Sequence, residues 1–187
     1  MKGAPVIKNI LVLHASPRSE GNSRALAEMF MAGAEAAGHQ IRCINIGKAD
    51  IKPCIACDHC RNNANNCLYQ DDMQELYPAI KGSDCVVFAA PLYFYGLPAQ
   101  LKAVLDRFYA FGPDYSFLQG KDCVLLMTAA DTSKNCFDGA VKNYQLALIN
   151  YLGWHDKGML LVGGVNAAGA IKDNPALAEA YRLGYNI

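Results

Sequence analysis

Short apolar runs, each followed by a stretch with helical spacing, constrain the fold more than any other feature of the sequence. Five such runs are rich in Ile, Leu and Val, which predicts strands that are buried on both faces. They are Val6–Leu13, Ile41–Ile46, Cys85–Ala90, Asp122–Met127 and Met159–Val162. Strands of this kind occur almost only in parallel sheets that are covered by helices on both sides.

The segments between these runs have helical patterns. Helices are predicted over Ser23–Ala37, from near Asp71, over Ala99–Phe111, over Phe137–Leu152, and after Asn174-Pro175. The alternation predicts a three-layered α/β fold, a flavodoxin-like, doubly wound, five-stranded parallel sheet of order 2-1-3-4-5. The competing dinucleotide-binding (Rossmann) fold requires G-x-G-x-x-G after the first strand and an acidic residue after the second. Neither is present. The loop after the first strand contains a single glycine, Gly21, and the second strand ends in Ile46-Gly47.

Length and charge exclude several functional classes. The 187 residues are expected to form one domain, residues 1–187, with residues 47–70 as a cysteine-rich loop insertion. Lys and Arg number 17 and Asp and Glu also 17, so no basic surface predicts nucleic-acid binding. The most apolar run, Cys85–Tyr95, is too short to span a membrane and contains Pro91. No secretory signal is visible near the first residues, so we expect a cytoplasmic protein.

The loop after the first strand has the composition of a phosphate site. Ser16, Asn22 and Ser23 offer short polar side chains, Arg18 offers a forked cation, and Gly21 permits close backbone approach. The start of the following helix adds free N–H groups and a favourable dipole. An ordinary strand–helix loop has a similar composition, but the position after the first strand favours a phosphate.

Two further loops converge on the same edge of the predicted sheet. The loop after the third strand is rich in aromatic and turn-forming residues, which are suited to a flat heteroaromatic ring or to covering the core. The loop after the fourth strand begins with Thr128 and Ala129 and can close over the other edge of that ring. We therefore count as cofactor-binding candidates the residues Pro91, Leu92, Tyr93, Phe94, Tyr95, Gly96, Thr128 and Ala129.

Cysteines crowd into the long connection that follows the second strand. The chain has eight cysteines, and the candidate metal ligands among them are Cys54, Cys57, Cys60 and Cys67. The C-x₂-C-x₂-C spacing lets three thiolates converge on one centre, and Cys67 can supply a fourth. Four thiolates suit a [4Fe–4S] cluster or a tetrahedral zinc ion. Cysteines that only line a pocket or pack an interface, without a metal, remain the alternative.

Several short motifs occur together between Ile7 and Phe111. They are Ser16-Pro17-Arg18, Gly21-Asn22-Ser23, Pro53-Cys54-x-x-Cys57-x-x-Cys60, Asp71-Asp72-Met73, Pro91-x-Tyr93 and Leu101-Lys102-x-x-x-Asp106-Arg107. In this combination the chain resembles the NAD(P)H-dependent FMN reductase superfamily. Its compact cysteine motif is similar to that of iron–sulfur flavoproteins.

The resemblance implies non-covalently held FMN and a homodimer or homotetramer. It implies that Ser16, Arg18, Asn22 and Ser23 hold the phosphate, while Pro91–Phe94 and Thr128–Ala129 border the isoalloxazine ring. It also implies that the four matched cysteines ligate a [4Fe–4S] cluster near the flavin.

The expected reaction is electron transfer from NAD(P)H through FMN to a small-molecule acceptor such as a quinone or a free flavin. No side chain is an obvious acid–base catalyst, and flavin chemistry needs none. The first alternative is an iron–sulfur flavoprotein that carries electrons to or from a ferredoxin-like partner. The second is a non-catalytic module that binds FMN or zinc. No nucleic-acid or membrane partner is expected.

Overall fold

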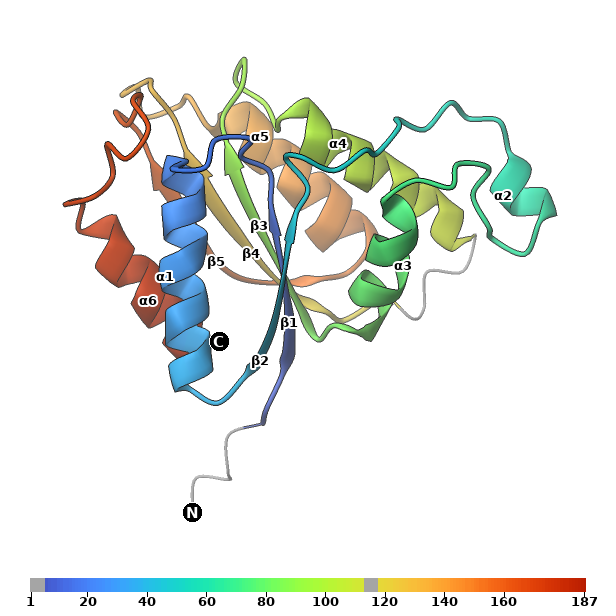
Figure 1. The fold of residues 1–187 in the computed structure, drawn as a ribbon, viewed down its shortest axis with the longest axis horizontal. Coiled ribbons are helices and arrows are strands. Elements are labelled where there is room, and N and C mark those ends of the chain that lie inside the picture. The colour runs from blue at the N-terminus through green and yellow to red at the C-terminus, as the bar shows by residue number, and fades with distance from the viewer. Residues whose placement is uncertain (1–5, 113–117) are drawn as a thin grey trace.

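A five-stranded, all-parallel sheet of order β2-β1-β3-β4-β5 forms the centre of the computed structural model (Figure 1). The structure describes residues 6–112 and 118–187; residues 1–5 and 113–117 of the predicted domain lie outside this range. The strands are β1 (Asn9–His14), β2 (Gln40–Asn45), β3 (Cys85–Pro91), β4 (Asp122–Thr128) and β5 (His155–Val162). The predicted flavodoxin-like order is thereby confirmed.

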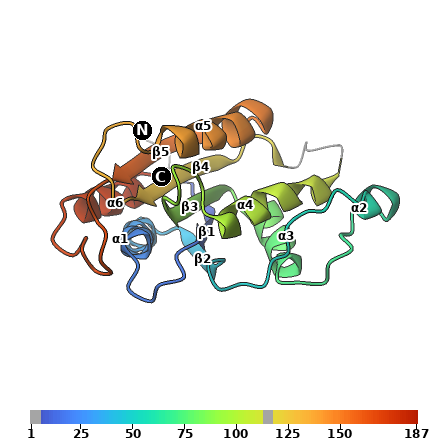
Figure 2. The same cartoon turned by 90° about the horizontal axis from the view of Figure 1, so that it is seen from above.

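Helices cover both faces of this sheet (Figure 2). One face carries α1 (Asn22–Ala36) and α6 (Ala176–Tyr185). The other carries α3 (Met73–Gly82), α4 (Ala99–Asp106), the 3₁₀ helix η1 (Arg107–Phe111), α5 (Asp138–Tyr144) and the π-helical turn η3 (Gln145–Tyr151). A short helix, α2 (His59–Asn62), lies within the cysteine-rich loop.

Two hydrophobic cores explain why the central strands are apolar throughout. Successive side chains of a strand point to opposite faces, so a strand with a helical layer on each side needs apolar residues at every position. Along β1, Ile10 and Val12 pack toward α1 and α6, whereas Leu11 and Leu13 pack toward α3 and α4. All four side chains are fully buried.

The edge strands differ from the prediction of strands buried on both faces. Much of β2 and β5 is exposed, and Met159 and Leu161 of β5 are more than one-third exposed. A strand at a sheet edge has a neighbour on one side only, and an apolar run does not reveal this position. The predicted helix Ala99–Phe111 also ends early, because η1 takes over at Arg107.

The switch point of the sheet lies between β1 and β3. The chain leaves β1 toward α1 on one face, and leaves β3 toward α4 on the other face. The two loops therefore diverge and open a crevice at the carboxyl edge of the sheet, where open α/β sheets bind their ligands. Among the described residues, no helix is long and apolar enough to cross a bilayer.

Candidate functional site

A cleft of about 220 Å³ lies at this switch point. Its walls come from the loops after β1, β3, β4 and β5. The lining residues are Ser16, Arg18, Gly21, Asn22, Ser23, Pro91, Leu92, Tyr93, Thr128, Ala129, Ala130, Val165 and Asn166. All the predicted cofactor-binding residues except Phe94, Tyr95 and Gly96 therefore meet in one cleft.

The floor of the cleft holds a polar group that lacks a partner. Ser16 and Ser23 are buried, and within the described chain the Ser23 hydroxyl makes no hydrogen bond. Ser23 lies in the first turn of α1, whose N-terminus has no side-chain cap. A buried hydroxyl left unpaired costs about 1–3 kcal/mol. An anion at the start of α1 would satisfy both this hydroxyl and the free N–H groups of the first turn.

Gly21 shapes the cradle in front of that helix end. Its φ of −69° is open to any residue, so the backbone does not require glycine here. The space does require it, because a Cβ at Gly21 would lie 2.2 Å from Oγ of Ser16. The absent side chain thus keeps the cradle open and leaves the Ser16 hydroxyl in place.

Asn22 lines the cleft, but its side-chain amide is hydrogen-bonded within the chain. Its side-chain Nδ2 donates to the carbonyls of Val165 (3.2 Å) and Ala167 (2.9 Å), and its Oδ1 accepts from the N–H of Ile171 (3.2 Å). The amide is therefore occupied in fixing the loop after β5. Only the backbone N–H of Asn22 is left to face a phosphate.

The loop after β5 forms a wall that sequence reasoning missed. Val165 and Asn166 line the cleft, and Nη1 of Arg18 donates to the Asn166 carbonyl at 3.0 Å. The hydrogen bonds join residues more than 140 positions apart, so no local pattern announces them. Arg18 itself is exposed at the mouth of the cleft, where its guanidinium can reach an anion.

Some residues of the aromatic loop after β3 line the cleft, and others lie at its rim. Pro91, Leu92 and Tyr93 line the cleft, and the Leu92 N–H donates to the Thr128 carbonyl at 2.7 Å. Phe94 and Tyr95 do not line it. They form the tip of a tight turn, where Phe94 is 103% exposed.

His14 ends β1 beside the loop that leads to α1 and is buried. Burial, followed by the charge of Arg24, lowers the pKa of His14 below its ordinary value of 6.5. The imidazole is therefore neutral at pH 7 and adds no charge to the cleft.

The four candidate cysteine ligands line a second, separate pocket. Cys54, Cys57, Cys60 and Cys67 surround it together with Tyr69, Arg107 and Tyr109, and all four cysteines are free thiols. Within residues 6–112 and 118–187, no group of three or more His, Cys, Asp or Glu side chains is arranged to hold a metal ion. This arrangement supports neither a zinc ion nor the predicted [4Fe–4S] cluster, and the metal stays a prediction.

A buried ion pair closes the neck of the cysteine-rich loop. Arg107 and Asp71 are each 1% exposed, and the two guanidinium Nη atoms contact the two carboxylate oxygens at 2.8 and 3.1 Å. Arg107 also donates to the Lys52 carbonyl, and Asp71 accepts from the Lys52 N–H. Both ends of the loop are thereby fixed to η1.

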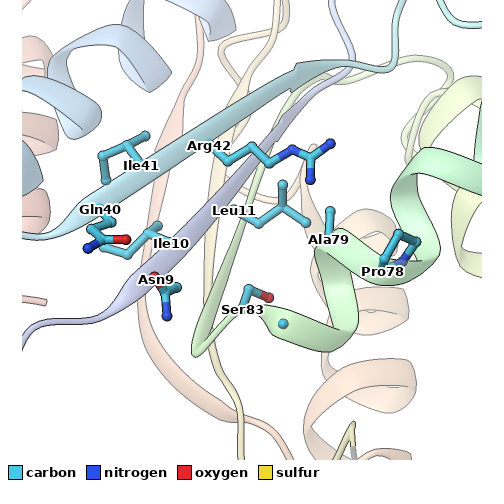
Figure 3. Close-up of a pocket in the computed structure, with 10 residues that line it drawn as sticks. Asn9, Ile10, Leu11, Gln40, Ile41, Arg42, Pro78, Ala79 and Ser83 are labelled. Carbon is cyan, nitrogen blue, oxygen red and sulfur yellow. The ribbon is translucent and has the colours of Figure 1, made fainter.

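Another cleft lies at the opposite, amino-terminal edge of the sheet (Figure 3). It is bounded by the first residues of β1 and β2 and by the C-terminal half of α3. Arg42 is its only charged residue and pairs with Glu75 at 2.6 Å. This cleft lies away from the carboxyl ends of the strands and lacks unpaired polar groups such as the one that marks the switch point.

Comparisons with known proteins identify the family. A model of the NADPH-dependent FMN reductase family matches residues 8–146, which is most of the chain. The chain belongs to the NADPH-dependent FMN reductase family. It is thus an FMN-dependent NAD(P)H oxidoreductase, as the resemblance of its motifs implied.

The relatives of this FMN reductase family member have two kinds of name. An iron–sulfur flavoprotein of Methanosarcina thermophila is 30% identical over 164 residues, 88% of this chain and 82% of that protein. A second iron–sulfur flavoprotein, from Archaeoglobus fulgidus, is 33% identical over 65% of this chain and 62% of that protein. An FMN-dependent NAD(P)H:quinone oxidoreductase of Pseudomonas aeruginosa is 30% identical over 60% of this chain and 58% of its own length.

Solved structures support the same fold. The NAD(P)H:quinone oxidoreductase from Methanothermobacter marburgensis superposes with a TM-score of 0.77. The superposition covers 97% of this chain and 96% of that chain at 21% sequence identity. The two proteins therefore share the flavodoxin-like architecture over their whole length.

Proposed function

We propose that the switch-point cleft binds FMN and that the protein transfers electrons from NAD(P)H to a small quinone-like acceptor. The observation that carries this proposal is the unpaired, buried Ser23 hydroxyl at the uncapped start of α1. It faces a cleft whose other walls, Pro91–Tyr93 and Thr128–Ala129, suit a flat ring. The quinone is proposed from the names of relatives and structural neighbours.

The phosphate end of the site depends on α1. The first-turn N–H groups and the Ser23 hydroxyl would donate to phosphate oxygens, and Arg18 would supply charge at the mouth. Asn22 would act indirectly by holding the Val165–Ile171 segment against the cleft. A cradle of this shape binds the phosphate of FMN and leaves the ring toward β3 and β4.

When bound, FMN supplies the two-electron redox chemistry. The loops after β3 and β4 would orient the ring. The overall reaction balances as NAD(P)H, a proton and a quinone giving NAD(P)⁺ and a hydroquinone. NAD(P)H supplies a hydride, which carries both electrons and one hydrogen. The remaining proton comes from solvent, because no buried acid or base of the described chain lines the cleft.

The test uses two glycine variants. Gly21→Ala fills the cradle, and we expect FMN affinity to fall about 5- to 150-fold, since overpacking a closed site costs about 1–3 kcal/mol. Gly82→Ala is the matched control, because a Cβ at Gly82 meets nothing within 4 Å. FMN affinity is measured by fluorescence quenching and turnover by NADPH oxidation with a quinone. Equal FMN affinity in folded Gly21→Ala and wild-type protein would place the flavin elsewhere.

A second candidate function is the iron–sulfur flavoprotein, which exchanges electrons with a ferredoxin-like partner. The specific observation that favours it is that Cys54, Cys57, Cys60 and Cys67 line one pocket. Ala56 and Asp58 have positive φ on either side of Cys57, and backbone of this kind gathers N–H groups around anions, including Fe–S centres.

Anaerobic iron and acid-labile sulfide analysis tests this candidate. If a [4Fe–4S] cluster is present, we expect about four iron atoms and four sulfide ions per chain. We expect both to be lost in Cys60→Ser. Cys43→Ser, at an exposed thiol on β2, is the control and is expected to keep them. Because no residue lines both the pocket and the cleft, FMN affinity is expected to be unchanged in both variants. One equivalent of zinc, or no metal at all, would exclude the cluster.

A further inference from the structure

The turn at the tip of the β3–α4 loop has an unfavourable backbone. Tyr93 and Gly96 exchange two backbone hydrogen bonds, of 3.2 and 3.0 Å, and enclose a two-residue turn. The enclosed residues have positive φ, +46° at Phe94 and +61° at Tyr95. Turns of this geometry favour Asn and Gly, because a side chain in the left-handed region is strained.

Phe94 gains no contact in return for this strain. Its side chain is 103% exposed, so none of its surface is covered by the described chain. A bulky aromatic ring therefore stands in solvent at a position where a smaller residue would fit the backbone better. Strained residues of this kind are concentrated at ligand sites.

The turn is fixed over the flavin cleft rather than free. The Tyr95 hydroxyl donates to Oδ2 of Asp131 at 3.3 Å, which joins the loops after β3 and β4. Gly139 of α5 packs so closely beneath the turn that a Cβ there would lie 2.5 Å from the Tyr95 carbonyl oxygen. Figure 1 shows this loop standing above the carboxyl edge of the sheet. Tyr93, which precedes Phe94, and Ala130, which precedes Asp131, both line the cleft.

We propose that Phe94 is a specificity-determining residue, whose ring forms the outer wall of the active site and selects flat, conjugated electron acceptors. The inference rests on the proposed function, because the inner wall would be the ring of bound FMN. A flat acceptor between the two rings gains stacking energy, about 0.5–1.5 kcal/mol beyond the area that it buries. A compact, non-aromatic oxidant gains nothing from Phe94.

Binding of coumarin, a flat and redox-inert probe, tests the wall without turnover. Calorimetry on FMN-loaded protein compares wild type with Phe94→Leu, which is apolar but lacks a ring, and Phe94→Trp, which keeps one. We expect coumarin affinity to fall about two- to tenfold in Phe94→Leu and to be kept in Phe94→Trp. Phe94→Asn, which suits the backbone of the turn, should match Phe94→Leu. Leu146→Ala, at a 49% exposed residue of η3, is the control.

Stopped-flow reoxidation of the dithionite-reduced enzyme gives the second measurement. 1,4-Naphthoquinone takes up two electrons and two protons, whereas ferricyanide takes one electron per molecule and needs no stacking. We expect Phe94→Leu to slow naphthoquinone about two- to tenfold and to leave ferricyanide unchanged. Unchanged coumarin affinity, or equal slowing of both oxidants, overturns the inference while FMN binding stands. A wild-type protein that binds no FMN overturns the proposed function and this inference together.

Discussion

Neighbouring residues of one motif have separate roles in this cleft. The buried hydroxyl of Ser23 has no hydrogen-bond partner in the described chain, and Gly21 leaves space beside Ser16. The side chain of Asn22 holds the loop after β5. Ser23 and Asn22 are small and polar, and Gly21 lacks a side chain. The sequence therefore indicates that the three residues belong to one loop, but it does not indicate which role each of them has. Hydrogen-bond partners, which depend on the fold, make the distinction.

The Asp71–Arg107 pair supplies a prediction at the scale of single residues. Burial alone would raise the pKa of Asp71, but hydrogen bonds from Arg107 and from the Lys52 N–H, with the Arg107 charge, hold it below 3.8. A carboxyl whose pKa is depressed on folding stabilises the protein above its unfolded pKa. This contribution is therefore complete above about pH 4 and is lost as the pH falls below that value.

Asp71→Asn leaves the Arg107 charge buried without its partner. We expect the free energy of unfolding to fall by about 3–5 kcal/mol at pH 7. The decrease should become smaller as the pH falls below about 4, because protonation of Asp71 in the unfolded wild-type protein then begins to remove the stabilisation that its carboxylate supplies. Urea unfolding at pH 7 and pH 3 measures both effects. Asp106→Asn, which removes an exposed i,i+4 partner of Lys102, should cost no more than about 0.5 kcal/mol. Similar decreases in the free energy of unfolding in both variants would contradict the stabilising role of the buried Asp71–Arg107 ion pair.

At the scale of elements, the sheet was predictable and its edges were not. A parallel strand between two helical layers must be apolar at each position, so β1, β3 and β4 are visible as continuous runs. Whether a strand lies at the edge depends on strand order, which explains the unpredicted exposure of β2 and β5. The helix predicted over Phe137–Leu152 is present, but the sequence did not indicate that its second half, η3, is π-helical. The short α2 left no periodic signal.

The candidate site was predictable where it follows strand ends. The loops after β1, β3 and β4 could be placed at one edge because parallel strands end there together. The wall formed by Val165 and Asn166 could not be predicted, because it depends on long-range bonds to Asn22 and Arg18. Phe94 and Tyr95 were expected in the cleft, but the turn geometry at Tyr93–Gly96 directs them to its rim.

The whole molecule combines a flavodoxin-like sheet, with a cleft at its switch point, and a separate pocket lined by cysteines. The cleft lies at the carboxyl edge between β1 and β3. The helix α2 and the loop segments on either side of it lie at the far end of the molecule in both views (Figures 1 and 2). The two sites have no lining residue in common. The homodimer or homotetramer and the cytoplasmic location stay predictions.

The central claim is that the α1 end of the cleft holds a flavin by its phosphate. The most direct measurement compares FMN with riboflavin, which lacks only the phosphate, in wild-type and Ser23→Ala protein. We predict that wild type prefers FMN. Ser23→Ala should lower FMN affinity about 10- to 150-fold, the value of a hydrogen bond to a charged group, and leave riboflavin affinity unchanged. Ser133→Ala, at an exposed serine outside the cleft, should change neither. Equal wild-type affinity for FMN and riboflavin, or equal loss of both in Ser23→Ala, would contradict the account.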